Sequence, residues 1–208
     1  LLVDNSTSFD LFDRGVVDGV YEKLKRKIPV EIRYIGYGEE SAIGDGILNY
    51  VQGDDNVLVA TDGHNNKGRD IGDMVLFASK LNTTISALSL EPVKSDIAVS
   101  LDGPAEVIQD TENTFEVRVS TAGSVPSYRL EVTVDGQVVV DKANAETHSF
   151  TQKFSEGYHR MIAKVYVNDH FKENNVYYKT IRVVPRPRVL FVSEKSSPMY
   201  EAIRKVYA

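Results

Sequence analysis

The period of the hydrophobic and polar positions changes near the middle of the chain. In the first part, short apolar runs alternate with segments whose apolar residues recur about every four positions. The apolar runs lie at 1–3, 30–35, 56–60 and 84–90, and the third is almost continuously apolar, as in a strand buried on both faces. This order predicts parallel strands with helices on both faces, a doubly wound α/β sheet.

Three segments of the first part have helical spacing. The first extends from Asp10 to Lys27 and is ended by Pro29, the second follows Ser41, and the third follows Arg69. The residues expected to face the sheet are Leu11, Val16, Val20, Leu24 and Ile28 in the first helix, Ile43, Ile47, Leu48 and Val51 in the second, and Ile71, Met74, Val75, Phe77, Ala78 and Leu81 in the third.

Beyond residue 94, apolar and polar residues alternate with a period of two. The segments that read as strands are 97–101, 114–119, 128–134, 137–140, 148–154, 158–167 and 175–184. Asp135-Gly136 between two of them is a strong two-residue hairpin signal. About seven short strands with regular turns predict an all-β, immunoglobulin-like sandwich over 94–185, although the Cys–Trp–Cys core of antibody domains is missing. The first domain is accordingly expected over 1–93.

The end of the chain, 186–208, is predicted to be a linker followed by the start of a truncated α/β domain. Pro185-Arg186-Pro187 is stiff, 188–193 reads as a buried strand, and Tyr200–Val206 has helical character. We expect Val189–Val192 to add to an exposed sheet edge of the first domain or of a neighbouring copy. The chain also begins inside an apparent strand and without Met, which suggests a piece of a longer protein.

Composition and charge narrow the classes of function. The chain has 208 residues, of which 42% are hydrophobic and 26% charged, as in an ordinary soluble globular protein. A net charge of −6 argues against a nucleic-acid or anionic-membrane surface. The chain has no cysteine, so disulfides, zinc thiolate sites and cysteine nucleophiles are excluded. No apolar run approaches the length of a membrane span.

Oxygen-bearing side chains follow three of the predicted strands. Asp4, Ser6 and Ser8 form a D-x-S-x-S pattern after the first, Ser41 follows the second, and Asp62 follows the third. The carboxyl ends of parallel strands meet at one edge of a sheet, where ligands bind in such folds. Carboxylates and hydroxyls suit hard cations such as Mg²⁺. The sequence therefore predicts a divalent-cation site at this edge.

These motifs resemble those of the von Willebrand factor A-domain (vWA) family and its metal-ion-dependent adhesion site (MIDAS). D-x-S-x-S matches the first family motif, Ser41-Ala42-Ile43-Gly44-Asp45-Gly46-Ile47 the second with Ser in place of Thr, and Thr61-Asp62-Gly63 the third. The match is to a short form, because the edge hairpin, last helix and last strand of the family are not evident. The final segment, 186–208, resembles the start of a class I glutamine-amidotransferase-like domain.

The resemblance implies a non-catalytic module that recognises a protein partner through a bound metal ion. Asp4, Ser6, Ser8, Ser41 and Asp62 would hold Mg²⁺, or else Mn²⁺ or Ca²⁺, and an acidic side chain of the partner would complete the shell. The residues expected to line the rim and select the partner are Glu39, Glu40, His64, Asn65 and Arg69. The parent protein would be prokaryotic and membrane-anchored, and this portion would be soluble; the extracytoplasmic side of the membrane is favoured, with the cytoplasmic side left open.

Two other functions are compatible with the same residues. One is a Mg²⁺-dependent hydrolase or phosphoryl-transfer site with Asp4 as nucleophile, although Ser6 stands where phosphatases of that kind have a second Asp. The other is a metal-free structural scaffold, which the shortened fold and Ser41 favour. Three histidines of the second part, His148, His159 and His170, fit no metal-ligand pattern and are expected at surface or turn positions.

Overall fold

The computed structural model describes residues 1–187, 190, 192 and 198–207. The chain forms two compact units, and each is described here by itself. The first unit comprises Leu1–Asp96 and Thr121–Pro126, and the second comprises Ile97–Ser120 and Ser127–Ala208. Among the described residues, no helix is both long enough and apolar enough to cross a membrane.

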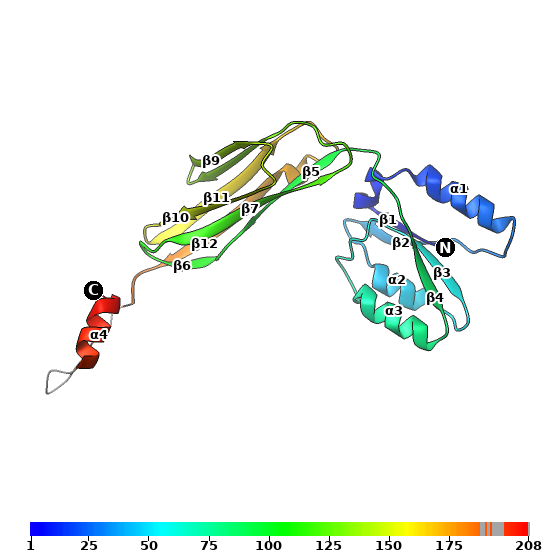
Figure 1. Ribbon diagram of the computed structural model, residues 1–208, viewed down its shortest axis with the longest axis horizontal. Coiled ribbons are helices and arrows are strands. Elements are labelled where there is room, and N and C mark those ends of the chain that lie inside the picture. The colour runs from blue at the N-terminus through cyan, green and yellow to red at the C-terminus, as the bar shows by residue number, and fades with distance from the viewer. Residues whose placement is uncertain (188–189, 191, 193–197, 208) are drawn as a thin grey trace. The chain divides into compact units, whose positions relative to one another are not determined.

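The first unit contains a four-stranded parallel sheet in the order β2-β1-β3-β4. Its strands are β1 (Leu2–Ser6), β2 (Arg33–Gly38), β3 (Asn56–Ala60) and β4 (Thr84–Leu88), and its helices are α1 (Arg14–Lys25), α2 (Ile43–Tyr50) and α3 (Ile71–Lys80). A 3-10 turn, η1 (Thr7–Leu11), joins β1 to the segment before α1. In Figure 1, α2 and α3 lie on one face of the sheet and α1 on the other.

Two separate hydrophobic clusters hold the helices against the sheet. The cluster under α2 and α3 contains the buried residues Leu2, Ile35, Ile43, Ile47, Val57 and Val59. The cluster on the opposite face contains Val3, Phe9, Val17 and Ala60. Successive residues of β1 point to opposite faces, so Leu2 enters the first cluster and Val3 the second.

The inward face of α1 differs from the predicted one. Val17 is buried, whereas Val16 is 46% and Ile28 is 53% exposed. The helix does not continue from Leu11, because the 3-10 turn intervenes and Asp13 caps a new start by accepting a hydrogen bond from Gly15 N at 2.8 Å. The phase of α1 is therefore set by Val17 and not by Leu11.

The second strand lies three residues further along than the sequence indicated. It was predicted over 30–35 and is found at Arg33–Gly38, so Gly36-Tyr37-Gly38 belongs to β2 rather than to the loop. Gly36 and Gly38 have φ angles of 76° and 58°, and the pairing with β1 is irregular between Asp4 and Ser6. The strand is thus bent where it reaches the carboxyl edge of the sheet.

The second unit is a β-sandwich, as predicted. Its strands are β5 (Asp96–Asp102), β6 (Glu106–Ile108), β7 (Asn113–Ala122), β8 (Arg129–Val134), β9 (Gln137–Ala143), β10 (Thr147–Gln152), β11 (Gly157–Tyr166) and β12 (Val176–Val184). They form one sheet in the order β10-β7-β5 and another in the order β6-β12-β11-β8-β9. Strand β6, which pairs in parallel with β12, was not anticipated because three residues give no readable alternation.

One continuous core lies between the two sheets of the sandwich. Its buried residues are Ile97, Val99, Leu101, Val107, Phe115, Val117, Val119, Tyr128, Leu130, Val132, Val134, Val140, Phe154, Met161, Ala163, Val165, Ile181 and Val183. The predicted hairpin at Asp135-Gly136 is confirmed, since both residues have positive φ angles (50° and 85°) and Val134 pairs with Gln137 across the turn.

The last described element is α4 (Pro198–Tyr207), which begins earlier than the helix expected from Tyr200. The strand expected over 188–193 lies mostly outside the described residues. The predicted addition of Val189–Val192 to a sheet edge lies outside them too and stays a prediction.

Candidate functional site

The carboxylate of Asp4 is the centre of a buried polar network at the carboxyl edge of the parallel sheet. Its Oδ1 accepts a hydrogen bond from Ser6 N at 2.9 Å, and its Oδ2 accepts from Ser41 Oγ and Thr61 Oγ1, each at 2.8 Å. Asp4 is 0%, Ser41 1% and Ser6 2% exposed. Three separate loops are therefore joined through one enclosed side chain.

The remaining predicted ligands lie around this network and make local contacts. Ser6 Oγ and Ser8 Oγ are 3.2 Å apart. Asp62 Oδ1 accepts from His64 N at 2.9 Å, and its Oδ2 lies 3.6 Å from His64 Nδ1. The Asp62 side chain is only 6% exposed, whereas that of His64 is 82% exposed. The fold thus gathers the five predicted residues on three neighbouring strand ends, and their oxygens form hydrogen bonds to other protein groups.

The loop after β3 is fastened to the loop before α2 by Asn66. Asn66 Oδ1 accepts from Ser41 N at 2.8 Å, and Asn66 Nδ2 donates to Glu39 O at 2.6 Å. Asn66 N also donates to Ser41 O at 3.0 Å. One asparagine side chain therefore satisfies backbone groups that would otherwise be left unpaired at a partly buried turn.

The predicted rim residues take part in the same loop-to-loop connection. Glu40 pairs with Lys67 at 2.5 Å. Asn65 Nδ2 donates to Arg69 O at 2.8 Å, and Arg69 in turn pairs with Asp45 at 2.7 Å. Glu40, Asn65 and Arg69 thus connect neighbouring loops within the unit, and the role of the rim residues in selecting a partner stays a prediction.

Two glycines allow the loops to come this close. A Cβ atom on Gly36, whose φ is 76°, would lie 2.9 Å from Asp4 Oδ1 and 3.0 Å from Glu40 O. A Cβ atom on Gly44 would lie 2.1 Å from Arg69 O. Any larger residue at these positions would push the loops apart, because the contacting atoms at Glu40 and Arg69 are backbone.

Sequence reasoning missed Thr61 and Asn66 as members of the network. Thr61 was quoted only as the neighbour of Asp62, although its hydroxyl contacts Asp4 directly. A signal was present, because the last residues of a buried strand alternate in direction and Thr61 is polar at such an end. Asn66 lies 25 positions from Ser41 and gave no comparable signal.

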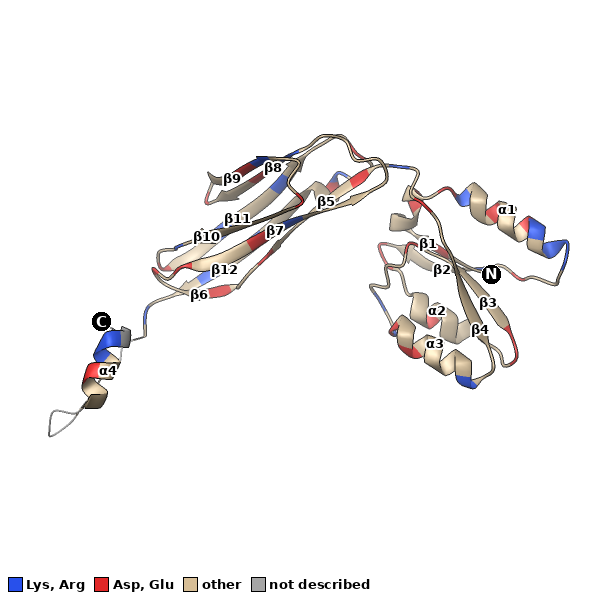
Figure 2. Cartoon of the chain, in the orientation of Figure 1, with Lys and Arg blue, Asp and Glu red and all other residues tan. Residues whose placement is uncertain are grey.

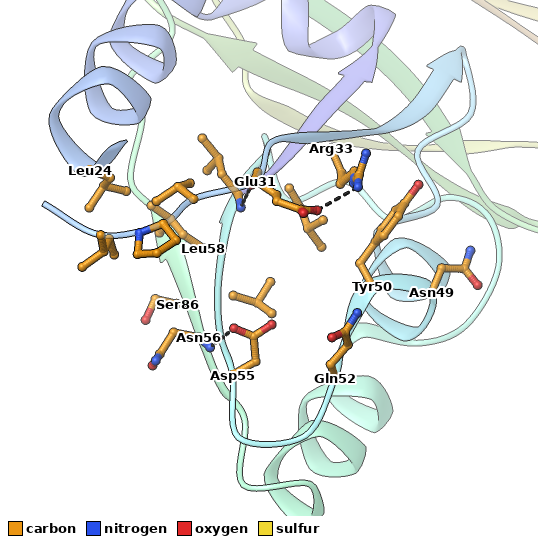
Figure 3. Close-up of a pocket in the computed structure, with 16 residues that line it drawn as sticks. Leu24, Glu31, Arg33, Asn49, Tyr50, Gln52, Asp55, Asn56, Leu58 and Ser86 are labelled. Carbon is orange, nitrogen blue, oxygen red and sulfur yellow. Dashed lines mark hydrogen bonds and ion pairs between the residues drawn. The ribbon is translucent and has the colours of Figure 1, made fainter. Parts of the chain in front are cut away.

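A concavity of about 600 Å³ lies at the opposite, amino-terminal edge of the same sheet. Figure 3 shows Glu31 turned toward Arg33, with Tyr50 beside the guanidinium, and Asp55 against Asn56. Glu31 and Arg33 are 2.7 Å apart, and Asp55 Oδ1 accepts from Asn56 N at 2.7 Å. The charged side chains of this concavity, Glu31, Arg33 and Asp55, each contact another protein group, so they do not define a ligand.

Comparisons with known proteins gave partial likenesses in structure only. No protein-family model matches the chain, and no curated protein matches it. The CARDB domain of a Pyrococcus furiosus protein, crystallised in complex with di-metal ions, is 26% identical with a TM-score of 0.39, covering 44% of this chain and 96% of that domain. Fibronectin(III)-like modules of CbhA from Clostridium thermocellum are 15% identical with a TM-score of 0.31, covering 49% of each chain. A PKD domain of an M14-like peptidase from a Thermoplasmatales archaeon is 14% identical with a TM-score of 0.31, covering 44% of this chain and 97% of that domain.

These findings correct the family assignment. The three structures named above are all-β domains of the immunoglobulin-like kind, and none of them is a vWA domain or a glutamine-amidotransferase-like domain. The immunoglobulin-like fold expected for the second unit is supported, whereas the vWA assignment of the first unit is wrong. The first unit does contain a parallel sheet, but a shared sheet arrangement does not imply the function of the vWA family.

The predicted metal-dependent recognition function is wrong as well. In the described part of the chain, no group of three or more His, Cys, Asp or Glu side chains is arranged to hold a metal ion. Both carboxylate oxygens of Asp4 are occupied by three protein donors. Binding of Mg²⁺ by individual residues and a partner that supplies an acidic side chain stay predictions.

Proposed function

We propose that this chain is a metal-independent, non-catalytic scaffold in which an α/β unit is followed by an immunoglobulin-like spacer. The observation that carries the proposal is the complete enclosure of Asp4. A carboxylate that accepts from Ser6, Ser41 and Thr61 while it is 0% exposed acts as a structural crosslink between strand ends.

The same enclosure argues against the hydrolase alternative. A carboxylate nucleophile must have a face from which it can reach the substrate. Asp4 is 0% exposed, and both of its carboxylate oxygens accept hydrogen bonds from protein groups. This carboxylate is therefore placed to hold the loops together and not to meet a substrate.

Immunoglobulin-like sandwiches frequently serve as spacers or interaction modules. The role of the second unit as a spacer, and the anchoring of a longer parent protein to a membrane, belong to this proposal. A scaffold with these properties would hold other domains of the parent at a distance from the membrane and would need no cofactor.

The test compares unfolding of the full chain in excess Mg²⁺ and in EDTA. A metal-independent scaffold has the same unfolding midpoint in both solutions, because nothing binds the native state selectively. Stabilisation by Mg²⁺ or Mn²⁺ that disappears in Asp62→Ala would contradict the proposal.

Asp4 provides the second arm of this test. We expect Asp4→Ala to lower the free energy of unfolding of the first unit by about 3 kcal/mol, because buried donors lose their acceptor. Asp4→Asn should cost less, since the amide keeps one oxygen and the two hydroxyls can reverse direction. Asp18→Ala, an exposed carboxylate on α1, is the matched control and should change stability by no more than about 0.5 kcal/mol.

A further inference from the structure

Helix α3 has an apolar surface on the side that faces solvent. Leu76 is 64% and Phe77 is 39% exposed, and within this helix only Ala78 is fully buried. A surface helix normally carries polar residues on its outer side. Large apolar residues gathered there indicate a surface that is covered in use.

Strand β4 follows α3 in the chain and forms one edge of the parallel sheet. Its sequence, Thr84-Ile85-Ser86-Ala87-Leu88, contains no charge, proline or glycine. Natural edge strands are usually blunted by such residues or by bulges, because an open edge recruits another strand. The opposite edge, β2, is bent at Gly36 and Gly38 and starts with Arg33, so β4 is the unprotected edge.

We propose that β4 and α3 form a two-fold interface with a second copy of this chain. Antiparallel pairing centred on Ser86 places Thr84 opposite Leu88 and Ile85 opposite Ala87 of the other copy, which are uncharged pairs. Two four-stranded sheets then become one continuous sheet. The two α3 helices meet on the same face and run antiparallel, because each helix runs opposite to its own β4.

Charge on α3 supports a second copy over an unrelated partner. Asp73 and Lys80 are both exposed and lie seven residues apart, with Leu76 and Phe77 between them on the same stripe. Figure 2 shows acidic colour at one end of α3 and basic colour at the other. Antiparallel packing of two such helices brings Asp73 of each copy to Lys80 of the other, so the surface is complementary to itself.

The experiment is sedimentation equilibrium of the full chain between about 1 and 100 μM, the range that resolves weak dimers. We expect a monomer–dimer equilibrium, and amides of β4 that exchange more slowly as concentration rises. A chain that stays monomeric throughout this range overturns the proposal, and so does a dimer with unprotected β4 amides.

Two variants locate the interface. Leu76→Lys should raise the dimer dissociation constant roughly tenfold or more, because it places a charge in the apolar centre. Val16→Lys on α1 changes another exposed apolar residue (46%, against 64% for Leu76) away from this surface and should leave the dimer unchanged. Equal effects of the two variants overturn the assignment of the interface to α3.

A charge exchange tests the orientation of the two copies. Lys80→Glu should weaken the dimer, and Asp73→Lys combined with Lys80→Glu should restore it. Both charges also favour their own helix ends, so the unfolding midpoint of each variant is measured at a concentration where only monomer exists. Failure of the double variant to recover the dimer, with the monomer still folded, overturns antiparallel packing.

Discussion

The α/β unit and the β-sandwich fill their interiors differently. The sandwich has one continuous cluster of apolar side chains between its sheets. The α/β unit divides its apolar residues into two smaller clusters on opposite faces of the sheet, and adds the buried network of Asp4, Ser6 and Ser41 at its edge. The sandwich has a buried polar contact as well, in which Asn175 Nδ2 donates to Asp169 Oδ1 at 2.8 Å, but its apolar core is continuous beside it. In the α/β unit the hydrogen bonds of Asp4 join strand ends that neither apolar cluster covers.

The difference extends to the surface. The α/β unit leaves an open edge strand without charged residues, β4, and exposed apolar residues on α3. The sandwich also exposes apolar residues on its edge strand β9, where Val138 is 55% and Val139 is 37% exposed, but β9 carries the charges of Asp141 and Lys142. A helix that packs on one face of a four-stranded sheet buries only the side that contacts the sheet. Apolar residues on the other side of a helix such as α3 stay exposed. The unit with the smaller core is therefore the one expected to need a partner.

The largest expected effect separates the two cores. Phe115 is 1% exposed and packs against Phe150 and Phe154, with ring centroids 5.8 and 5.9 Å away. We expect Phe115→Ala to lower the free energy of unfolding of the sandwich by about 4 kcal/mol, through lost burial and a cavity. Hydrogen exchange should accelerate in peptides of the sandwich.

Phe9→Ala is the corresponding change in the α/β unit. Phe9 is 0% exposed but belongs to a cluster of only four buried residues, where η1 can collapse toward the gap. The loss should be about 3 kcal/mol and confined to peptides of the first unit. If either substitution accelerates exchange equally in both units, the two cores are one cooperative system and the comparison fails.

The two units also differ in how much of them could be predicted from sequence. The strands of the sandwich were predicted well. The alternation of apolar and polar residues and the Asp135-Gly136 turn are local patterns, each visible within a few residues of the sequence. In the α/β unit the strand β3 was placed correctly, but the face of α1 was wrong at Val16. The helix starts after its N-cap, Asp13, and this start could not be recognised because Asp13 is one of several polar residues in that part of the sequence.

The candidate site shows where such reasoning stops. The topology argument placed Asp4, Ser41 and Asp62 at one edge, since parallel strands share their carboxyl ends. In the structure Ser41 Oγ lies 2.8 Å from Asp4 Oδ2, whereas Asp62 contacts His64. It could not tell whether the oxygens face a metal ion or each other. That depends on Thr61 and Asn66, whose side chains fill the space between loops through contacts that are distant in sequence.

A pair of glycine substitutions sharpens the contrast between close and loose packing within the α/β unit. A Cβ atom on Gly46 of α2 would lie 2.6 Å from Ile35 Cγ2, whereas one on Gly19 of α1 would meet nothing within 4 Å. Gly46→Ala should destabilise the unit by about 2 kcal/mol through overpacking. Gly19→Ala should stabilise it by about 0.5 kcal/mol, because alanine favours the helix and reduces the entropy of the unfolded chain.

Thermal unfolding of the two variants under identical conditions is the measurement. Destabilisation by Gly19→Ala as large as that by Gly46→Ala would mean that α1 packs as closely as α2. The proposed difference in packing density between the α1 face and the α2 face of the sheet would then be contradicted.

A smaller effect than that of Gly46→Ala is expected at a polar pair of the sandwich, His159 and Asp135. His159 was expected at a plain surface or turn position, but its side chain is only 14% exposed, and its Nδ1 lies 2.6 Å from Asp135 Oδ2 while Nε2 lies 2.9 Å from Ser155 O. Both neighbours accept hydrogen bonds, so the arrangement favours the doubly protonated ring. The hydrogen bond to Asp135 raises the pKa of His159 above its ordinary value, against a smaller opposing effect of burial. Burial by itself would raise the pKa of Asp135, but the bonds from His159 and Arg160 N hold it below its usual range.

Because the pKa of His159 is higher in the folded than in the unfolded chain, its protonation stabilises the fold. This stabilisation is fully present below the pKa of the unfolded chain, about 6.5, and is lost as pH rises through the pKa of the folded chain. The lowered pKa of Asp135 gives stability that is lost only as pH falls through its own folded value. We therefore expect the difference in unfolding free energy between wild type and His159→Gln to be largest near pH 5 to 6, at no more than about 1 kcal/mol, and to shrink toward pH 9. Asp135→Asn, which removes the carboxylate partner of His159, is the second variant and should reduce this trend. A difference that stays constant with pH would mean that His159 contributes through packing against Phe154, whose ring centroid is 5.1 Å away, and that the sandwich relies on shape even at its polar edge.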